Sequence, residues 1–508
     1  MANHLIKKQV LDIKQKGLKH NDFDEISSIY YSRVIPVLEN VFDNVGHDGN
    51  VIRIDKLEID AGIINISNFE NEFPEKIKKL LFDKIQKISH GSNLLPDINS
   101  KQCSEPESKL ELITYFLENG TLPWWSKPIE NPEIIFMEVL KLYPDNIKKL
   151  LIDNIENEEL IKRLLFQFKD DILNKILAAV ISKDKCEVIE LLIDFNIIYS
   201  VSELKTINAE HFRYNIYKSI LMYGSEKDNI GNETIYYSKI LRYFAYKYNI
   251  SYKKLITWFY LKTSSIKTAS FKLFINREYG KIMNNKDNEY INSVNMTGKS
   301  DEPESGKVPE DTIETDTLVD FNYTADSENV SEKGIKTFDD IEGSGYYVEN
   351  SGLVLLFPYL KSYFVNLNLM RGNEFKNFES RIKALHLLQY LATGKTDNPE
   401  YLLILNKILC GIGINVPIAR EVFLSEYEKN ETESLLISAI ENWAVLKNTS
   451  IEGFREAFLK RNGILTEYED KWILKVERKA FDILIERIPW SFSIIKFPWM
   501  RKILYVEW

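Results

Sequence analysis

A long acidic segment with few large apolar side chains divides this chain, so a single continuous core is excluded. The segment from Asn284 to Tyr346 is rich in Asp, Glu, Ser, Thr and Asn and has no helical or strand periodicity. Such a composition buries too little apolar surface to offset the conformational entropy lost on ordering. We therefore predict a disordered acidic linker over residues 284–346, with folded parts on both sides of it.

The acidic segment also explains the charge of the whole protein. Residues 299–346 hold 14 Asp and Glu against 4 Lys, and the 508-residue chain has a formal net charge of −10. The remainder is close to neutral, which argues against nucleic-acid binding because phosphate contacts need a basic surface. A hydrophobic content of 44% supports real cores, and 508 residues exceed the size of one core, so several domains are expected.

The distribution of apolar residues and cysteines indicates the cellular compartment of the protein. No stretch approaches the ~20 consecutive apolar residues that a membrane span needs. The charged N-terminal stretch MANHLIKKQVLDIKQKG does not match a signal peptide, so we expect a cytoplasmic protein without membrane contact. Cys103, Cys186 and Cys410 are far apart and form neither a CxxC pair nor a zinc pattern with histidines, which predicts reduced, structural cysteines.

The first 90 residues predict a small α/β domain. Residues 4–13 and 51–60 have the short apolar or alternating pattern of strands. Residues 24–42 and 73–85 place apolar side chains at helical spacing, which gives a β-α-β-α order. Beyond them, Ser, Asn and Pro accumulate, and a linker is predicted over residues 91–107.

A helical domain is predicted over residues 108–283. Its first helix begins at a capping box formed by Ser108 and Glu111 and ends at Gly120. The segment YPDNIKKLL is echoed by FKDDILNKIL 25 residues later, which suggests helical hairpins. Ordinary paired helices explain this echo better than a named repeat family does, and they make the following apolar side chains core residues: Leu164, Leu165, Phe168, Ile172 and Ile176.

A second helical domain, ending in a short strand pair, is predicted over residues 347–508. One helix ends with a C-cap at Gly394, the next begins at Asn398 and Pro399, and a third begins at Thr432. The β-prone runs KWILKVE and KILYVEW at the end of the chain give the strand pair. The fold class is therefore mainly α and multidomain.

Familiar catalytic and cofactor-binding patterns are missing from the sequence. Two stretches end in Gly-Lys-Ser or Gly-Lys-Thr, but Ser293 and Gln389 stand where a phosphate-binding loop needs its first glycine. The 6 histidines are isolated, and with 75 carboxylates no spacing nominates an acid and base pair. We expect no enzyme activity, no cofactor, no metal and no small-molecule substrate.

Tryptophans beside prolines are the most distinctive local feature. Proline fixes the backbone and removes a donor, so each cluster is a rigid turn that presents large flat side chains. Two interpretations stay open: these tryptophans close the edge of a core, or some are exposed anchors for a partner protein, since Trp is frequent at binding hot spots. The candidate protein-docking or structural residues are Leu122, Pro123, Trp124, Trp125, Pro489, Trp490, Pro498, Trp499 and Trp508.

An ordered set of motifs at both ends of the chain carries a family resemblance. In sequence order they are HLIKKQVLDI, IRIDKLEIDAG, FLENGTLPWW, SGLVLLFPYLKSYF, RIKALHLLQYLATG, LLILNKILCGI, IPWSFSIIKFPWM and YVEW, about 90 residues in all. With these motifs the chain resembles the tape measure family of extracellular contractile injection systems, the phage-tail-like particles of bacteria. The middle helices and the acidic segment do not contribute to the resemblance.

The resemblance implies a non-enzymatic assembly protein that sets or templates the length of the inner tube, with inner-tube, baseplate and cap proteins as partners. It implies no catalytic residue, and it allows incorporation into the finished particle. A ruler in the phage-tail sense is a long helix, and 508 helical residues would span roughly 760 Å, whereas 15 prolines and short amphipathic helices predict compact domains. An assembly chaperone or baseplate scaffold of the same machine is therefore an open alternative, as is a cargo effector or enzyme.

Overall fold

The computed structural model describes the chain except for residues 1–3, 5, 7, 8, 14–25, 44–49, 66, 67, 90–99, 127–130, 182–184, 202, 203, 205–208, 225–232, 296–344 and 447. The chain forms two compact units. The first comprises residues 1–115 and 122–142, and the second comprises residues 116–121 and 143–508. No helix in the described part of the chain is both long and apolar enough to cross a bilayer.

The first unit combines helices with a two-stranded sheet. Its elements are η1 (Tyr30–Val34), α2 (Ile35–Asp43), β1 (Asn50–Ile54), α3 (Phe69–Ser89), β2 (Ser100–Ser104), the first turns of α4 (Glu105–Asn119) and α5 (Pro132–Leu142). Helices α2 and α3 pack on each other. Two small apolar clusters seal them, one around Val34, Phe73 and Ile77 and the other around Val41, Leu81 and Ile85.

The predicted strand order of this unit is wrong, although its two helices are confirmed. Those residues of 4–13 that the structure describes are not in a strand. The partner of β1 is instead β2, antiparallel, with Val51 opposite Cys103. This strand lies inside the predicted linker 91–107, and its sequence, SKQCS, buries only Cys103. A strand with one buried side chain has too weak an alternation to be recognised.

Helix α4 begins one turn earlier than predicted. Its capping box is formed by Ser104 and Glu107: the Ser104 amide donates to the Glu107 carboxylate at 2.8 Å, and the Glu107 amide donates to the Ser104 hydroxyl at 3.3 Å. Ser108 lies inside the helix and accepts a hydrogen bond from Arg53 at 2.7 Å. The predicted end at Gly120 is confirmed, since Gly120 has φ of 71° and its amide donates to Phe116.

The second unit begins with a segment of packed helices, here called the helical segment (residues 143–295). Helix α10 contacts α6, α7 and α8, and α6 also contacts α8. The two echoed sequences form α6 and α8, so they are ordinary paired helices. The helices are α6 (Pro144–Asp153), α7 (Glu158–Gln167), α8 (Asp170–Ile181), α9 (Lys185–Val201), α10 (Ala209–Gly224), α11 (Glu233–Lys247), α12 (Tyr252–Leu261), η5 (Thr263–Ser265) and α13 (Ala269–Asn295).

Aromatic side chains fill the interior of the helical segment. Phe195 of α9 lies against Phe244, Phe259 and Phe271, which come from α11, α12 and α13. Four of the five predicted core residues, Leu164, Leu165, Phe168 and Ile176, are buried, and Ile172 is half-buried.

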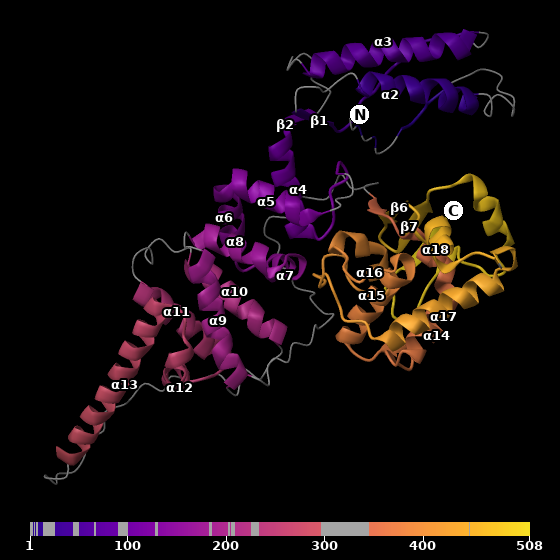
Figure 1. Cartoon of the computed structure of the whole chain (residues 1–508). Helices are drawn as coiled ribbons and strands as arrows, with labels where there is room; N and C mark the ends of the chain where they lie inside the picture. The colour runs from indigo at the N-terminus through magenta and orange to yellow at the C-terminus, as the bar shows by residue number, and fades with distance from the viewer. Residues whose placement is uncertain are drawn as a thin grey trace, which may run out of the picture. The chain divides into compact units, whose positions relative to one another are not determined.

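Helix α13, the long rose-coloured helix in Figure 1, is fixed at its start by a buried carboxylate. Asp194 of α9 accepts the amide hydrogens of Lys267 and Thr268 at 2.7 and 2.9 Å. A carboxylate at a helix N-terminus satisfies unpaired amides and favours the helix dipole. The helix continues past Asn284, where the acidic linker was predicted to begin. The greater part of that linker, residues 296–344, lies outside the described residues.

The C-terminal region (residues 345–508) contains short helices and a mixed sheet. Its elements are β3 (Tyr346–Val348), η6 (Ser351–Leu356), α14 (Phe357–Asn366), β4 (Met370–Arg371), β5 (Glu374–Phe375), α15 (Phe378–Thr393), η7 (Glu400–Leu403), α16 (Ile404–Leu409), α17 (Glu426–Asn442), η8 (Ala444–Leu446), α18 (Ile451–Phe454), η9 (Arg455–Leu459), β6 (Gly463–Glu467), β7 (Lys471–Val476), η10 (Ala480–Arg487), β8 (Ile494–Ile495) and β9 (Ile503–Glu507).

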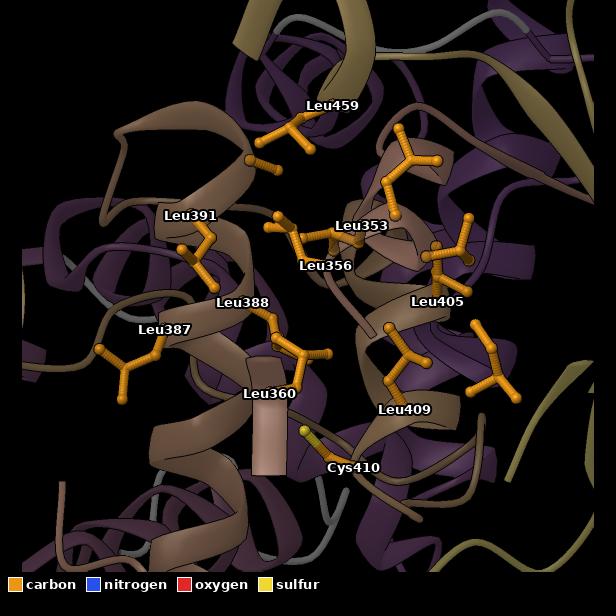
Figure 2. Packing of buried hydrophobic residues seen from close by; sticks show 14 of the residues in the cluster. Leu353, Leu356, Leu360, Leu387, Leu388, Leu391, Leu405, Leu409, Cys410 and Leu459 are labelled. Atoms are coloured by element: carbon orange, nitrogen blue, oxygen red, sulfur yellow. The ribbon is translucent and has the colours of Figure 1, made fainter. Parts of the chain in front are cut away.

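The predicted terminal strand pair exists but belongs to a larger sheet. Its strand order is β3-β6-β7-β9-β8, in which β7 and β9 are parallel neighbours and the other pairs are antiparallel. Leu474, Leu504 and Ile495 from this sheet join one apolar cluster with the helices. Figure 2 shows the helical side of that cluster, where Leu356, Leu388 and Leu409 gather from η6, α15 and α16.

Two predicted helix starts in the C-terminal region are wrong. Asn398 does not cap a helix; its amide donates to Arg420, and a 3₁₀ turn follows before α16. Helix α17 begins after Ser425, which forms a capping box with Glu428, so Thr432 lies inside it and bonds the hydroxyl of Tyr363. The start of α17 is not recognisable from the sequence, because the Ser-x-x-Glu motif that begins at Ser425 precedes a polar turn rather than an apolar run. The predicted C-cap at Gly394 is confirmed, with φ of 68°.

Candidate functional site: the tryptophan clusters and a buried junction

The first tryptophan cluster, Leu122–Trp125, is a turn of the first unit. Pro123 is buried and Leu122 is half-buried, whereas Trp124 keeps 37% of its surface exposed. Trp125 lies under Arg53, whose guanidinium carbon is 3.4 Å from the ring centroid, a cation–π contact. Because Arg53 also bonds Ser108 and Glu111 of α4, this arginine ties the turn to the helix.

The second cluster is integrated into the C-terminal region. Trp499 is buried, donates its indole N–H to the carbonyl of Leu409 at 2.9 Å and stacks on Phe497 with centroids 4.6 Å apart. Trp490 is half-buried and donates to the carbonyl of Leu355 at 2.8 Å. The two prolines, Pro489 and Pro498, are exposed beside them. These contacts fit the core-closing interpretation of both tryptophans.

Trp508 is half-buried and packs over a charged pair. Its indole N–H donates to Asp482 at 3.0 Å, and its ring lies 5.4 Å from the guanidinium of Arg461. Arg461 is fully buried and forms an ion pair with Asp482. The carbonyl of Trp508 accepts from Arg478 at 2.6 Å. Trp508 is therefore held on the C-terminal region by its contacts with Asp482, Arg461 and Arg478, and its role in docking a partner stays a prediction.

A buried ionic site that the sequence did not predict joins the helical segment to the C-terminal region. Arg163 of α7, Glu400 of η7 and Lys407 of α16 are each fully buried. Arg163 Nε donates to Glu400 Oε2 at 3.1 Å, and Lys407 Nζ donates to Glu400 Oε1 at 2.7 Å. One carboxylate thus pairs with two cations, which are 244 positions apart in sequence.

Backbone carbonyls complete this site. Arg163 also donates to the carbonyls of Leu117 and Asn415, and Lys407 donates to that of Ile414 at 2.6 Å. Gly120 lies directly against the site: a Cβ on it would come within 2.3 Å of Glu400 Oε1 and 2.8 Å of Arg163 Nε. Only glycine fits there, because both its positive φ and this close approach exclude a side chain.

A second set of bonds lies beside the ions. Gln167 of α7 donates its side-chain amide to the carbonyl of Ile418 at 2.7 Å and accepts the amide hydrogen of Glu400 at 2.9 Å. The amide of Arg420 donates to the carbonyl of Phe166 at 3.1 Å. Outside α7, the rings of Phe116 and Tyr401 meet edge to face, with centroids 5.7 Å apart. We call this whole set of contacts the junction.

Burial perturbs the ionisable groups at and near the junction. Desolvation lowers the pKa of Lys407, and the adjacent Glu400 carboxylate opposes this shift. Desolvation raises the pKa of Glu159, against the attraction of Arg163. Elsewhere in the C-terminal region, burial lowers the pKa of His386 to about 4. In the described part of the chain, no group of His, Cys, Asp and Glu has the arrangement of a metal site.

One signal in the sequence could have pointed to Arg163. It lies three residues after Leu160 and four before Gln167, on the side of α7 that also holds the buried Leu164. A charged residue in an apolar stripe is an exception that needs a buried partner. Nothing in the sequence could name that partner, because Glu400 lies 237 positions away.

The fold is that of a mainly helical protein with a small mixed sheet in its C-terminal region. The model of the family described as "Contractile injection system tape measure protein" matches residues 3–508, so the chain belongs to this family. No curated protein and no solved structure matches the chain. The chain is therefore a structural protein of contractile injection system assembly, as the motifs at its two ends predicted.

Proposed function

We propose that this protein sets or templates the length of the inner tube of a contractile injection system. The observation that carries the proposal is the family match, which extends over residues 3–508 and so includes the helical segment as well as the two ends. The partners would be the inner-tube, baseplate and cap proteins. The protein would be made in the cytoplasm and incorporated into the particle during assembly.

The helix lengths limit how such a template can work. In the described part of the chain the longest helix is α13, with 27 residues, which correspond to about 40 Å at ~1.5 Å per residue. Helices α6, α7 and α12 have 10 residues each and contribute side chains to a packed interior. A template of this kind would therefore consist of folded bodies together with α13, and not of one helix that extends along the whole tube.

An insertion series in α13 tests the proposal. Adding 28 helix-forming residues after Gly280 lengthens a continuous helix by roughly 42 Å, and a template predicts that the tube lengthens in proportion. Gly280 suits the insertion, since a side chain there would meet no other atom within 4 Å. The matched control inserts 28 Gly and Ser residues at the same place. Electron-microscope length histograms give the result, and unchanged, sharply distributed lengths with both inserts would contradict the template.

A second candidate function is an assembly chaperone or baseplate scaffold of the same machine. The packing of α9, α11 and α13 around Phe195, Phe244 and Phe271 favours it, because a folded body offers a fixed binding surface rather than an extended length. Mass spectrometry of purified particles separates the two functions. A template inside the tube remains in the particle, whereas a chaperone is absent from it.

A further inference from the structure

The helical segment and the C-terminal region each have an apolar interior of their own. The cluster around Leu388, Trp443 and Leu474 is built only from residues of the C-terminal region. The aromatic interior around Phe195 is built from α9, α11, α12 and α13 of the helical segment. The cluster of the C-terminal region therefore takes no residue from the helical segment, so it would stay closed if the two bodies separated.

The contacts that cross the junction are mostly polar. They are the ion pair from Arg163 to Glu400, the bond from Arg163 to the carbonyl of Asn415, the bonds of Gln167 and the amide bond from Arg420 to Phe166. The end of α4 adds an aromatic contact to the C-terminal region, that of Phe116 with Tyr401. Water can replace each of the hydrogen bonds when the surfaces part, which makes their net contribution small. A polar interface therefore opens at lower free energy than an apolar interior of similar size does.

Packing beside Gln167 is also incomplete. A hollow of about 450 Å³ lies between the helical segment and the strand-like stretch Ala419–Glu421. Charged side chains from both bodies line it, among them Lys169, Asp170, Arg213 and Arg420. A hollow of this size and polarity holds water, so the junction is already partly hydrated when it is closed.

The ion pairs are arranged so that opening of the junction leaves no charged side chain buried without a partner. Glu400 keeps Lys407, which is in the same body, and Arg163 alone moves into water. At the hollow, Arg213 pairs with Asp170 inside the helical segment, and Arg420 pairs with Asp397 inside the C-terminal region. Leaving an unpaired charge buried is the main penalty for breaking an ion pair, and here that penalty is avoided on both sides.

From these observations we propose that the junction is a latch: the helical segment and the C-terminal region separate as intact folded bodies while both interiors remain closed. The proposal does not depend on the length-setting function. Opening would expose the polar side of α7 and the stretch from Asp397 to Glu421 for contact with other proteins. Arg163 is the residue that holds the latch closed, because it reaches the carboxylate and two carbonyls of three separate chain stretches.

Hydrogen exchange of the full chain, followed by mass spectrometry of overlapping peptides, tests the latch. The amides of Glu400 and Arg420 bond across the junction, so their protection reports the closed state directly. We expect these two amides to exchange at least tenfold faster than those of α11 and β7. We further expect Arg163→Met to speed their exchange at least tenfold while leaving α11 and β7 unchanged.

The control variant is Lys175→Met, which removes an equal charge from an exposed pair with Asp171 on α8. It should leave the exchange of Glu400 and Arg420 as in the parent protein. The latch proposal would be overturned if, in the parent protein, these two amides exchanged at the same rate as the amides of α11 and β7. So would an Arg163→Met variant in which all four sites exchange faster together, since the two bodies would then open only by global unfolding.

Discussion

The first unit and the C-terminal region bury their apolar side chains on very different scales. Along α2 and α3 of the first unit, two separate clusters contain three buried side chains each. In the C-terminal region one continuous cluster draws on every helix from α14 to α18 and on strands of the five-stranded sheet. The stability of the α2–α3 pair therefore depends on a narrow seam, whereas in the C-terminal region stability is distributed over many contacts.

The same difference changes what one sequence signature means. Tryptophan beside proline occurs in both places, yet Trp499 fills the large cluster and Trp124 lies at a surface turn. A large interior offers backbone carbonyls that an indole N–H can reach, as Leu409 does for Trp499. Trp124 lies in the turn between α4 and α5 and belongs to neither cluster of the α2–α3 pair. The local sequence thus specifies a rigid aromatic turn, and the size of the neighbouring core decides whether the aromatic ring is buried.

The largest expected effect follows removal of Leu504 to Trp508. These residues form most of β9, which lies between β7 and β8, so the truncation opens the sheet and exposes Leu474 and Ile495. We expect the C-terminal region to lose its cooperative unfolding transition and particle assembly to stop. Circular dichroism during urea unfolding gives the first result, and particle yield gives the second.

The control for this truncation is Glu507→Gln, which changes only an exposed side chain of the same strand. It should leave both unfolding and yield unchanged. A truncated protein that retains the full unfolding transition but fails to assemble would show that the chain end docks a partner. Normal yield from the truncation would contradict both roles of β9.

A smaller effect is expected from Glu400→Gln at the junction. The substitution leaves Arg163 and Lys407 as two buried cations without a carboxylate, and breaking a buried pair in this way costs about 3–5 kcal/mol. Arg163→Met should cost less, because Glu400 keeps Lys407. Urea unfolding of both variants measures the difference. Equal losses from the two substitutions would mean that Lys407 does not neutralise Glu400 by itself.

Acid should weaken the C-terminal region through His386, a smaller effect again. Burial lowers the pKa of His386 from 6.5 to about 4, so the folded state binds this proton less readily than the unfolded state does. The contribution is fully present above pH 6.5 and is lost as the pH falls through about 4. At 1.36 kcal/mol per pKa unit it amounts to about 3 kcal/mol at most.

The variant His386→Leu isolates this contribution. Its interior position, with 2% of the surface exposed, accepts a leucine of similar volume. The difference in unfolding free energy between parent and variant should shrink or reverse between pH 7 and pH 4.5, as measured by urea unfolding at each pH. A constant difference across that range would show that His386 is not buried in its neutral form.

Much of the helical architecture could be predicted, because apolar spacing and helix caps are local properties. Leu385 and Leu388 on one stripe of α15, with a C-cap at Gly394, are such a case. The sheet was harder: β3 and β6 are separated by more than 100 residues, and Tyr347 pairs with Ile464 across that distance. At the junction, Glu400 pairs with Lys407, 7 positions away, and with Arg163, 237 positions away. No residue spacing along the chain indicates the second pair.

The smallest effect on stability is expected from Trp124→Ala, which also tests the contrast between the two tryptophan clusters most directly. Trp124 keeps 37% of its surface exposed, so its loss should reduce the unfolding free energy of the first unit by about 1 kcal/mol, less than the loss of a fully buried ring does. As comparison, Trp499→Ala removes a buried ring and its bond to Leu409 and should cost about 3–5 kcal/mol.

If Trp124 anchors a partner, its removal weakens that contact by about 2 kcal/mol, roughly 30-fold. Particle yield and co-purification with tube and baseplate proteins should then fall for a variant that is folded normally, which no effect on stability would explain. Normal yield and co-purification from Trp124→Ala would exclude this residue as an anchor and would leave packing as its role.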